Sequence, residues 1–128
     1  MRKTRTPVDQ FEWLFRRSYS SPEHKFMYPD GTPTSRVFKL RAKDNGELSV
    51  DVKSLTDPAV AIGDPARFML FEVENKIVLD LGLNSLYDPL NLEEHGIDNP
   101  SHAIITGMVE DDEILPGLLA KNATRVII

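Results

Sequence analysis

The chain has 128 residues, no cysteine and a net charge of −5, and 41% of its residues are hydrophobic. That length predicts one domain with an ordinary core, and the lack of cysteine excludes disulfide bonds and thiolate metal sites. The acidic balance argues against general nucleic-acid binding, which needs a surplus of Lys and Arg. Because no apolar run is long enough to cross a bilayer and no secretory signal opens the chain, we expect a cytoplasmic protein without membrane contact.

The first segment is predicted to be a frayed basic tail over residues 1–6, followed by a short helical turn that leads into a strand near Trp13. The proline of the step Thr6-Pro7 is typical of a first helical position. The alternation of large side chains up to Tyr19 favours a strand instead. We therefore expect the turn to be brief.

The stretch from Ser35 to Lys53 predicts a β-hairpin, because its two halves alternate with period 2 around an Asp-Asn-Gly turn. The expected core face of the second half consists of Leu48, Val50 and Val52, and the opposite face of Ser49, Asp51 and Lys53. Ser49 is interpreted as a serine on the polar face, since the local sequence supplies no base that would make it a nucleophile.

The rest of the chain alternates between loops, helices and strands. Two Asp-Pro steps mark a loop with one helical turn, residues 67–73 predict a buried strand, and residues 74–84 favour a helix over a return strand. Residues 84–101 are expected to be a long loop. Strands are expected at 102–108 and at 124–128, the latter buried, on either side of a helix within 110–123. This order predicts an α+β fold, with a mostly antiparallel sheet and a few helices packed on one side.

Known catalytic and metal-binding motifs are missing. The three histidines, His24, His95 and His102, lack helical spacing, and no metal site is predicted. The glycines form neither a dinucleotide fingerprint nor a phosphate loop, and no serine-hydrolase elbow occurs. His102 follows Pro100 at a loop-to-strand junction, where an imidazole can hydrogen-bond a loop carbonyl and fix the start of the strand. We favour that structural role over a catalytic or ligand-binding one.

Polar and aromatic residues of the first half include Arg16, Arg17, Tyr19, Ser35 and Arg36. The segments "LFRRSYS" and "NPSH" resemble the small ADP-ribosyltransferase-like toxin domains of bacteria, which open with an arginine on the first strand and can carry a late Asn-Pro-x-His segment. The resemblance implies NAD as a ligand. It places Arg16 or Arg17 on the phosphates, Tyr19 or Tyr28 on the nicotinamide and Glu72 on a ribose hydroxyl, with His102 as a further candidate.

A second resemblance covers more of the chain. The segment "DGTPTSRVFKLRAKDNGELSVD" with "NPSHAI" is similar to small bacterial or phage-type proteins that share Ser-x-x-Phe, Leu-Ser-Val and Asn-Pro-x-His-Ala. This resemblance implies a coherent bacterial or phage-type domain and carries no activity with it.

Two functional hypotheses follow. The first is a non-catalytic module, without a cofactor, that binds another macromolecule, most simply a protein, in a toxin or defence context. Its binding residues are apolar side chains of the 84–101 segment, Tyr87, Leu90 and Leu92. The alternative is an NAD-consuming enzyme that uses Arg16, Arg17, Tyr19, Glu72 and His102. The basic first half of the chain could face an anion or nucleotide in either case.

Overall fold

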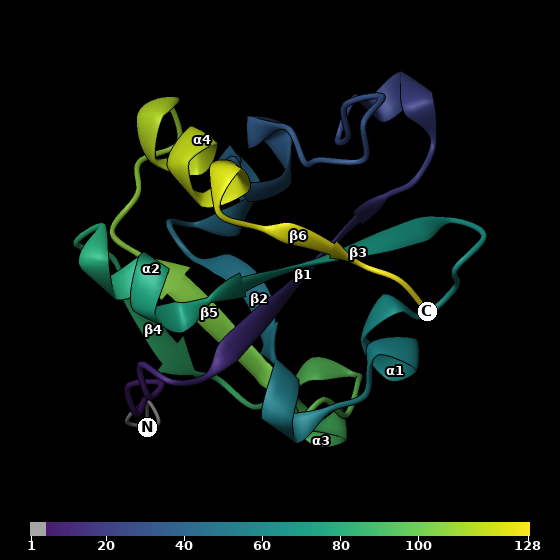
Figure 1. Cartoon of the computed structure of the whole chain (residues 1–128). Coiled ribbons are helices and arrows are strands. Elements are labelled where there is room, and N and C mark those ends of the chain that lie inside the picture. The colour runs from purple at the N-terminus through teal and green to yellow at the C-terminus, as the bar shows by residue number, and fades with distance from the viewer. Residues whose placement is uncertain (1–4) are drawn as a thin grey trace.

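In a computed structural model, which describes residues 5–128, six strands form one antiparallel sheet in the order β4-β5-β2-β1-β3-β6 (Figure 1). The strands are β1 (Trp13–Tyr19), β2 (Leu48–Val52), β3 (Phe68–Glu74), β4 (Asn84–Tyr87), β5 (His102–Thr106) and β6 (Thr124–Val126). With several short helices around this sheet, the predicted α+β class is confirmed.

The predicted tail falls partly outside the described residues, which begin at Arg5. Arg5 forms ion pairs with Glu47 and Asp88. The carbonyl of Thr6 accepts a hydrogen bond from the backbone amide of Tyr87. The prediction of a frayed tail is therefore wrong for Arg5 and Thr6, because both are bonded to residues at or just after the end of β4, and Arg5 also pairs with Glu47.

The two faces of the sheet bury side chains in two clusters of unequal size, since successive side chains of a strand point to opposite faces. Leu14 of β1 joins the larger cluster, which also includes Leu48, Val50 and Phe71. Its neighbour Phe15 joins a smaller cluster on the other face. β1 thus separates the two cores, and both of these side chains are fully buried.

The helices are divided unevenly between these faces. The larger cluster is covered by α4 (Ile114–Lys121), α2 (Asn75–Asp80) and the 3-10 turn η2 (Ser35–Phe38). The smaller one is covered by α1 (Pro58–Ile62), and Figure 1 shows α1 and α4 on opposite sides of the sheet. The remaining helical segments are η1 (Pro22–His24), η3 (Ala42–Asp44), η4 (Lys53–Leu55) and α3 (Leu92–His95).

The first half of the predicted hairpin is wrong. Instead of a strand, the chain forms η2 and η3, and β2 pairs with β1 and β5. The physical reason lies at Val37 and Phe38, which are adjacent yet both fully buried in the same cluster. A strand would send them to opposite faces, whereas a tight helical turn places both against the core. Asn45 of the expected turn has a positive φ of 51°, but this residue ends η3 and does not join two strands.

Several other elements lie where they were predicted. The strands β1 and β5 and the helices α1, α2 and α4 fall within the expected segments, and β3 extends one residue beyond the expected strand 67–73. Gly82 follows α2 with a φ of 82°, as expected for a residue that ends a helix in the left-handed region. In these elements the conformation favoured by the local sequence is also the one that packs in the fold.

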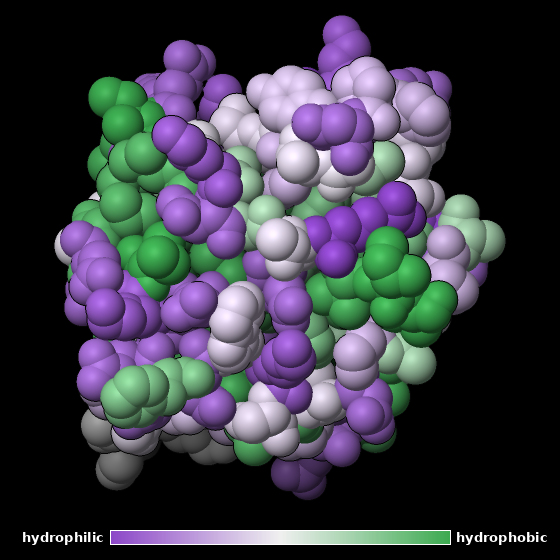
Figure 2. All heavy atoms as spheres, viewed as in Figure 1, coloured by the Kyte–Doolittle hydropathy of each residue, from purple (hydrophilic) through white to green (hydrophobic). Residues whose placement is uncertain are grey.

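Two predictions about the second half of the chain are wrong. The 84–101 segment is only partly a loop, because its first four residues form β4 against β5 and residues 92–95 form α3, capped by the Asn91 side chain. The end of the chain is not buried either. Ile127 is 81% exposed and Ile128 60% exposed. Figure 2 shows hydrophobic residues at the surface there and also over α4.

The assignment of faces in β2 is confirmed and predicts unequal effects of two substitutions. Val50 is buried and Ser49 is exposed. We expect Val50→Ala to lower the free energy of unfolding by about 1 to 3 kcal/mol through lost burial and a residual cavity. Ser49→Ala should lower it by about 0.5 kcal/mol or less. Urea denaturation of both variants checks this, and equal losses would contradict the assignment.

Candidate functional site

A groove opens where β1 and β2 separate from each other. These strands pair only through Leu14 with Val52 and Phe15 with Asp51. Beyond that point β1 continues along β3 to Tyr19, while β2 continues along β5. The fork leaves a groove of about 840 Å³ that reaches residues from both faces of the sheet. That volume is within the range of small-molecule sites, about 300 to 1,000 Å³.

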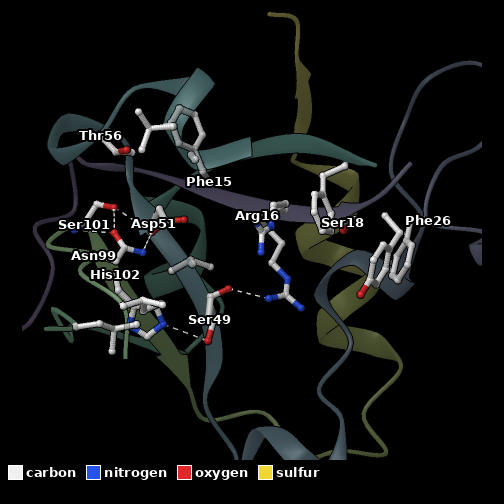
Figure 3. Close-up of a pocket in the computed structure, with 18 of the residues that line it drawn as sticks. Phe15, Arg16, Ser18, Phe26, Ser49, Asp51, Thr56, Asn99, Ser101 and His102 are labelled. Atoms are coloured by element: carbon white, nitrogen blue, oxygen red, sulfur yellow. Dashed lines mark hydrogen bonds between the residues drawn. The ribbon is translucent and has the colours of Figure 1, made fainter. Parts of the chain in front are cut away.

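Arg16 occupies the fork between the two strands. Its Nε donates to the carbonyl of Val37 at 2.9 Å, and one terminal nitrogen donates to the carbonyl of Ser49 at 2.8 Å (Figure 3). Burial lowers the pKa of Arg16 to about 10, with Asp44, Arg41 and Arg17 as smaller influences. The guanidinium therefore stays charged at neutral pH. Two of its five N–H groups are used by these carbonyls, and the others remain for a ligand in the groove.

Two further arginines, Arg17 and Arg36, line the same groove. The guanidinium of Arg17 lies over the ring of Phe68, 4.2 Å from its centroid, and that of Arg36 lies 5.7 Å from the centroid of Phe26. Within residues 5–128, neither these two guanidinium groups nor that of Arg16 has a carboxylate at ion-pair distance. Among the described residues, Arg16 contacts two carbonyls, and Arg17 and Arg36 each lie over an aromatic ring.

The groove is cationic although the chain is acidic. Its lining includes five cationic side chains, Arg16, Arg17, Arg36, Lys39 and Arg41, against the two carboxylates of Asp51 and Asp98. Lys39 pairs with Glu113 and Arg41 with Asp44, both at the exposed rim. Five of the basic residues of the first half thus gather around one opening. A cleft lined by one sign of charge concentrates ligands of the opposite sign.

Aromatic rings gather at one end of the groove. Tyr19 stacks on His24 with 4.9 Å between ring centroids, and it lies 5.1 Å from Phe68. The ring of Phe26 lies 6.2 Å from His24 and, like those of Tyr19 and Phe68, lines the groove. Flat apolar faces beside arginines suit a ligand that combines a ring with an anion.

His102 lies at the opposite end, next to Ser49. Its Nδ1 is 2.8 Å from the backbone carbonyl of Asp88 and 3.3 Å from the Asp88 carboxylate. Its Nε2 is 3.2 Å from the hydroxyl oxygen of Ser49 (Figure 3). The predicted hydrogen bond from His102 to a loop carbonyl is therefore present. The imidazole also has a second contact, which faces the groove.

A polar cluster stands beside this histidine. One oxygen of the Asp51 carboxylate accepts hydrogen bonds from the Asn99 amide and the Ser101 hydroxyl, each at 2.9 Å. The Ser101 hydroxyl is also 2.7 Å from the Asn99 side-chain oxygen. These contacts fix the loop before β5 against β2 and so hold His102 in place.

The structure brings four of the five residues of the NAD hypothesis together. Arg16, Arg17, Tyr19 and His102 all line the groove, although they come from two distant segments. Glu72 does not line it. The Glu72 carboxylate pairs with the Lys53 ammonium at 2.8 Å, beside Phe15, which is opposite Glu72 in the pairing of β1 with β3. Tyr28, the other stacking candidate, borders a separate, smaller cavity near α4.

The three residues of the interaction hypothesis are placed differently from one another. Tyr87 is half-buried, packs against the larger core, and has its pKa raised by burial and by Glu12. Leu90 is half-buried and lines the groove. Leu92 is 67% exposed. Of these side chains, only that of Leu92 is largely free to meet a partner.

Sequence reasoning missed several groove residues, chiefly Ser49, Asp51, Asn99 and Phe26. No local motif marks them. The sequence feature that could have indicated Ser49 and Asp51 is the polar face of β2. In the antiparallel pairing of β2 with β5, Asp51 lies opposite His102. That pairing brings Ser49 within reach of the imidazole.

Neither metal ligation nor a membrane span is found in the described part of the chain. Residues 5–128 hold no group of three or more His, Asp or Glu side chains arranged to bind a metal ion. None of the helices described there has the length and apolar character needed to traverse a bilayer. Comparison of the chain with protein families, with curated proteins and with solved structures finds no match.

Proposed function

We propose that the groove binds a nucleotide through its phosphates. The observation that carries this proposal is the convergence of Arg16, Arg17 and Arg36 on one groove, with no carboxylate of residues 5–128 at ion-pair distance from them. A planar guanidinium donates paired hydrogen bonds to phosphate oxygens, which an ammonium cannot do. Of the three, Arg16 is the one whose guanidinium is withdrawn from solvent, whereas Arg17 and Arg36 are exposed. A desolvated cation is costly to the fold, and such cations are concentrated at functional sites.

The aromatic end of the groove supports a base or nicotinamide ring as the second part of the ligand. Tyr19, Phe26 and Phe68 offer ring faces next to Arg17 and Arg36. A nucleotide joins a flat ring to an anion within the dimensions of this groove. NAD is one member of that class. The proposed role of Glu72 in NAD consumption lacks support, because Glu72 does not line the groove. Asp51, the residue opposite His102 in the pairing of β2 with β5, is a carboxylate that does line it.

Calorimetric titration with ADP, NAD and adenosine tests the proposal. We expect ADP to bind at least about 100-fold more tightly than adenosine, because each charge-assisted bond to a phosphate contributes about 1.5 to 3 kcal/mol. Arg36→Ala should weaken ADP binding about tenfold or more without unfolding the chain, since Arg36 is exposed. Lys76→Ala is the matched control, because Lys76 is an exposed cation on α2 outside the groove.

Equal affinities for ADP and adenosine, or an equal effect of both substitutions, would contradict a phosphate site. Nicotinamide release from NAD by the same samples tests the NAD-consuming reaction separately. No release by a folded sample that binds ADP would remove that reaction and keep the nucleotide site.

A second proposal, an intracellular module that binds another protein in a bacterial toxin or defence context, is supported by exposed apolar side chains near α3. Leu92 is 67% exposed and Ile97 55% exposed. Apolar side chains of this kind suit the rim of a protein interface. If the titration above detects no nucleotide, this proposal becomes the preferred one.

A further inference from the structure

Three side chains lie in series at one wall of the groove. The Ser49 hydroxyl lies 3.2 Å from Nε2 of His102. Nδ1 of His102 lies 3.3 Å from a carboxylate oxygen of Asp88, whose other oxygen pairs with Arg5. They come from β2, β5 and the residue after β4, which are neighbours in the sheet. The order hydroxyl, imidazole, carboxylate is the arrangement by which enzymes activate a serine.

The surroundings of His102 select the tautomer that this activation needs. Nδ1 faces the carbonyl oxygen of Asp88 at 2.8 Å, and a carbonyl can only accept a hydrogen bond. We therefore assign the proton of the neutral ring to Nδ1. Nε2 then has a free electron pair directed at the Ser49 hydroxyl, which donates to it. A base in this state can remove the serine proton.

Access and charge at Ser49 also suit a reaction. Ser49 is exposed and lines the groove, while the His102 side chain is only 13% exposed and is held from two sides. The Ser49 carbonyl accepts from Arg16 at 2.8 Å, so the residue lies between an imidazole and a guanidinium (Figure 3). Positive charge beside a nucleophile stabilises the negative charge that develops on an attacked phosphate.

We propose that Ser49 is a nucleophile for phosphoryl transfer, with His102 as its base and Asp88 as the residue that positions His102. The substrate class is a phosphate diester or anhydride of a nucleotide, and this choice of substrate rests on the proposed nucleotide site. In the first step the serine oxygen bonds to phosphorus, and the serine proton passes to Nε2. The bond from phosphorus to the leaving oxygen breaks, and that oxygen takes the proton from Nε2.

The second step returns the enzyme to its starting state. Water attacks the phosphoserine and gives a proton to Nε2 of His102. The bond between the serine oxygen and phosphorus breaks, and the serine oxygen takes this proton. No oxidant, reductant or additional reactant is needed.

The alternative to this proposal is a structural role. In that case the hydrogen bond between Ser49 and His102 only joins β2 to β5, and Ser49 has the low reactivity of an ordinary serine.

Labelling with a fluorophosphonate tests the proposal without any nucleotide. The serine oxygen bonds to the phosphorus of the probe, fluoride leaves, and the proton passes to His102. We expect one label per chain, located at Ser49 by peptide mass spectrometry. His102→Asn should slow labelling by about 100-fold or more, the contribution typical of a general base. Asparagine keeps an N–H donor for the Asp88 carbonyl, so that the start of β5 is preserved, and circular dichroism checks folding.

Ser54→Ala is the matched control. Ser54 is an exposed serine whose hydroxyl donates to a Glu12 carboxylate at 2.6 Å, with no imidazole next to it. Labelling should be unchanged in this variant and absent in Ser49→Ala. Turnover is then measured as nitrophenol release from the p-nitrophenyl ester of thymidine 5′-phosphate. This release should require both Ser49 and His102. Asp88→Asn should reduce its rate about tenfold or more, because the imidazole of His102 is then less well positioned.

The outcomes separate the two proposals. Absence of a label at Ser49, or equal labelling rates in the wild type and His102→Asn, overturns the nucleophile and leaves the nucleotide site standing if ADP still binds. A label at Ser49 in a chain that binds no ADP overturns the nucleotide site instead. Protection of Ser49 from the label by ADP is the result expected if both proposals hold.

Discussion

Replacement of Asn75 by alanine is expected to lower the free energy of unfolding by about 3 kcal/mol, although Asn75 lies far from any proposed chemistry. Its side chain is fully buried at the start of α2. The amide nitrogen donates to the carbonyls of Val8 and Asp9, at 3.1 and 3.0 Å. The amide oxygen accepts from the Ser85 hydroxyl at 2.7 Å. One side chain thus joins the N-terminal segment, α2 and β4.

The size of the effect follows from the groups that alanine would leave without a partner. A buried polar group that loses its hydrogen bond costs about 1 to 3 kcal/mol. The Val8 carbonyl and the Ser85 hydroxyl are both affected, and the lost volume adds a cavity. The Asp9 carbonyl keeps a hydrogen bond from the backbone amide of Glu12, so its loss counts less.

Thermal and urea denaturation measure this prediction. Asn84→Ala is the matched control, because Asn84 is exposed at the start of β4, only nine positions along the chain. It should change the free energy of unfolding by about 0.5 kcal/mol or less. Similar losses at the two asparagines would show that the buried bonds contribute little.

The parts of the fold that could be predicted are those with a local signal. Asp57-Pro58 begins α1, Gly82 ends α2, and the run of large apolar residues after Arg67 forms β3. The prediction of a strand in the first half of the hairpin failed because Val37 and Phe38, which a strand would direct to opposite faces, both pack in the larger cluster, and η2, which contains them, contacts α4. Tertiary packing decided between two conformations that the local sequence permits.

The candidate site shows the same limit more sharply. Arg16, Arg17 and His102 could be selected by residue type, because guanidinium groups suit phosphate oxygens and imidazole groups can act as bases or ligands near neutral pH. Ser49 could not, since its partner is 53 positions away and reaches it only through the pairing of β2 with β5. Whether a serine has a base beside it depends on sheet order, which local patterns do not contain.

Replacement of Arg16 by leucine is expected to weaken ADP binding by about 100-fold or more while changing the free energy of unfolding by about 1 kcal/mol or less. On the side of binding, the variant loses the one guanidinium fixed in the fork, together with its charge. On the side of stability, two opposing effects nearly cancel. Leucine leaves the carbonyls of Val37 and Ser49 without this donor, but it also removes a buried charge that has no carboxylate partner in residues 5–128.

The pKa of Arg16 supports this balance. Because burial lowers that pKa to about 10, below the value in the unfolded chain, the unfolded state binds its proton more tightly. The charged group therefore opposes folding at neutral pH, and this opposition weakens as the pH rises above about 10. Replacing it removes an unfavourable contribution. A residue that is retained at a cost to stability is typical of a binding site.

Calorimetry with ADP and urea denaturation of the same samples check both halves of the prediction, and Arg16→Lys separates charge from shape. Lysine keeps the charge but cannot bond both carbonyls and a phosphate from one planar group, so we expect an affinity between those of the wild type and the leucine variant. A loss of stability above about 3 kcal/mol in Arg16→Leu would show that Arg16 mainly joins β1 to η2 and β2. Unchanged ADP binding in that variant would remove Arg16 from the site.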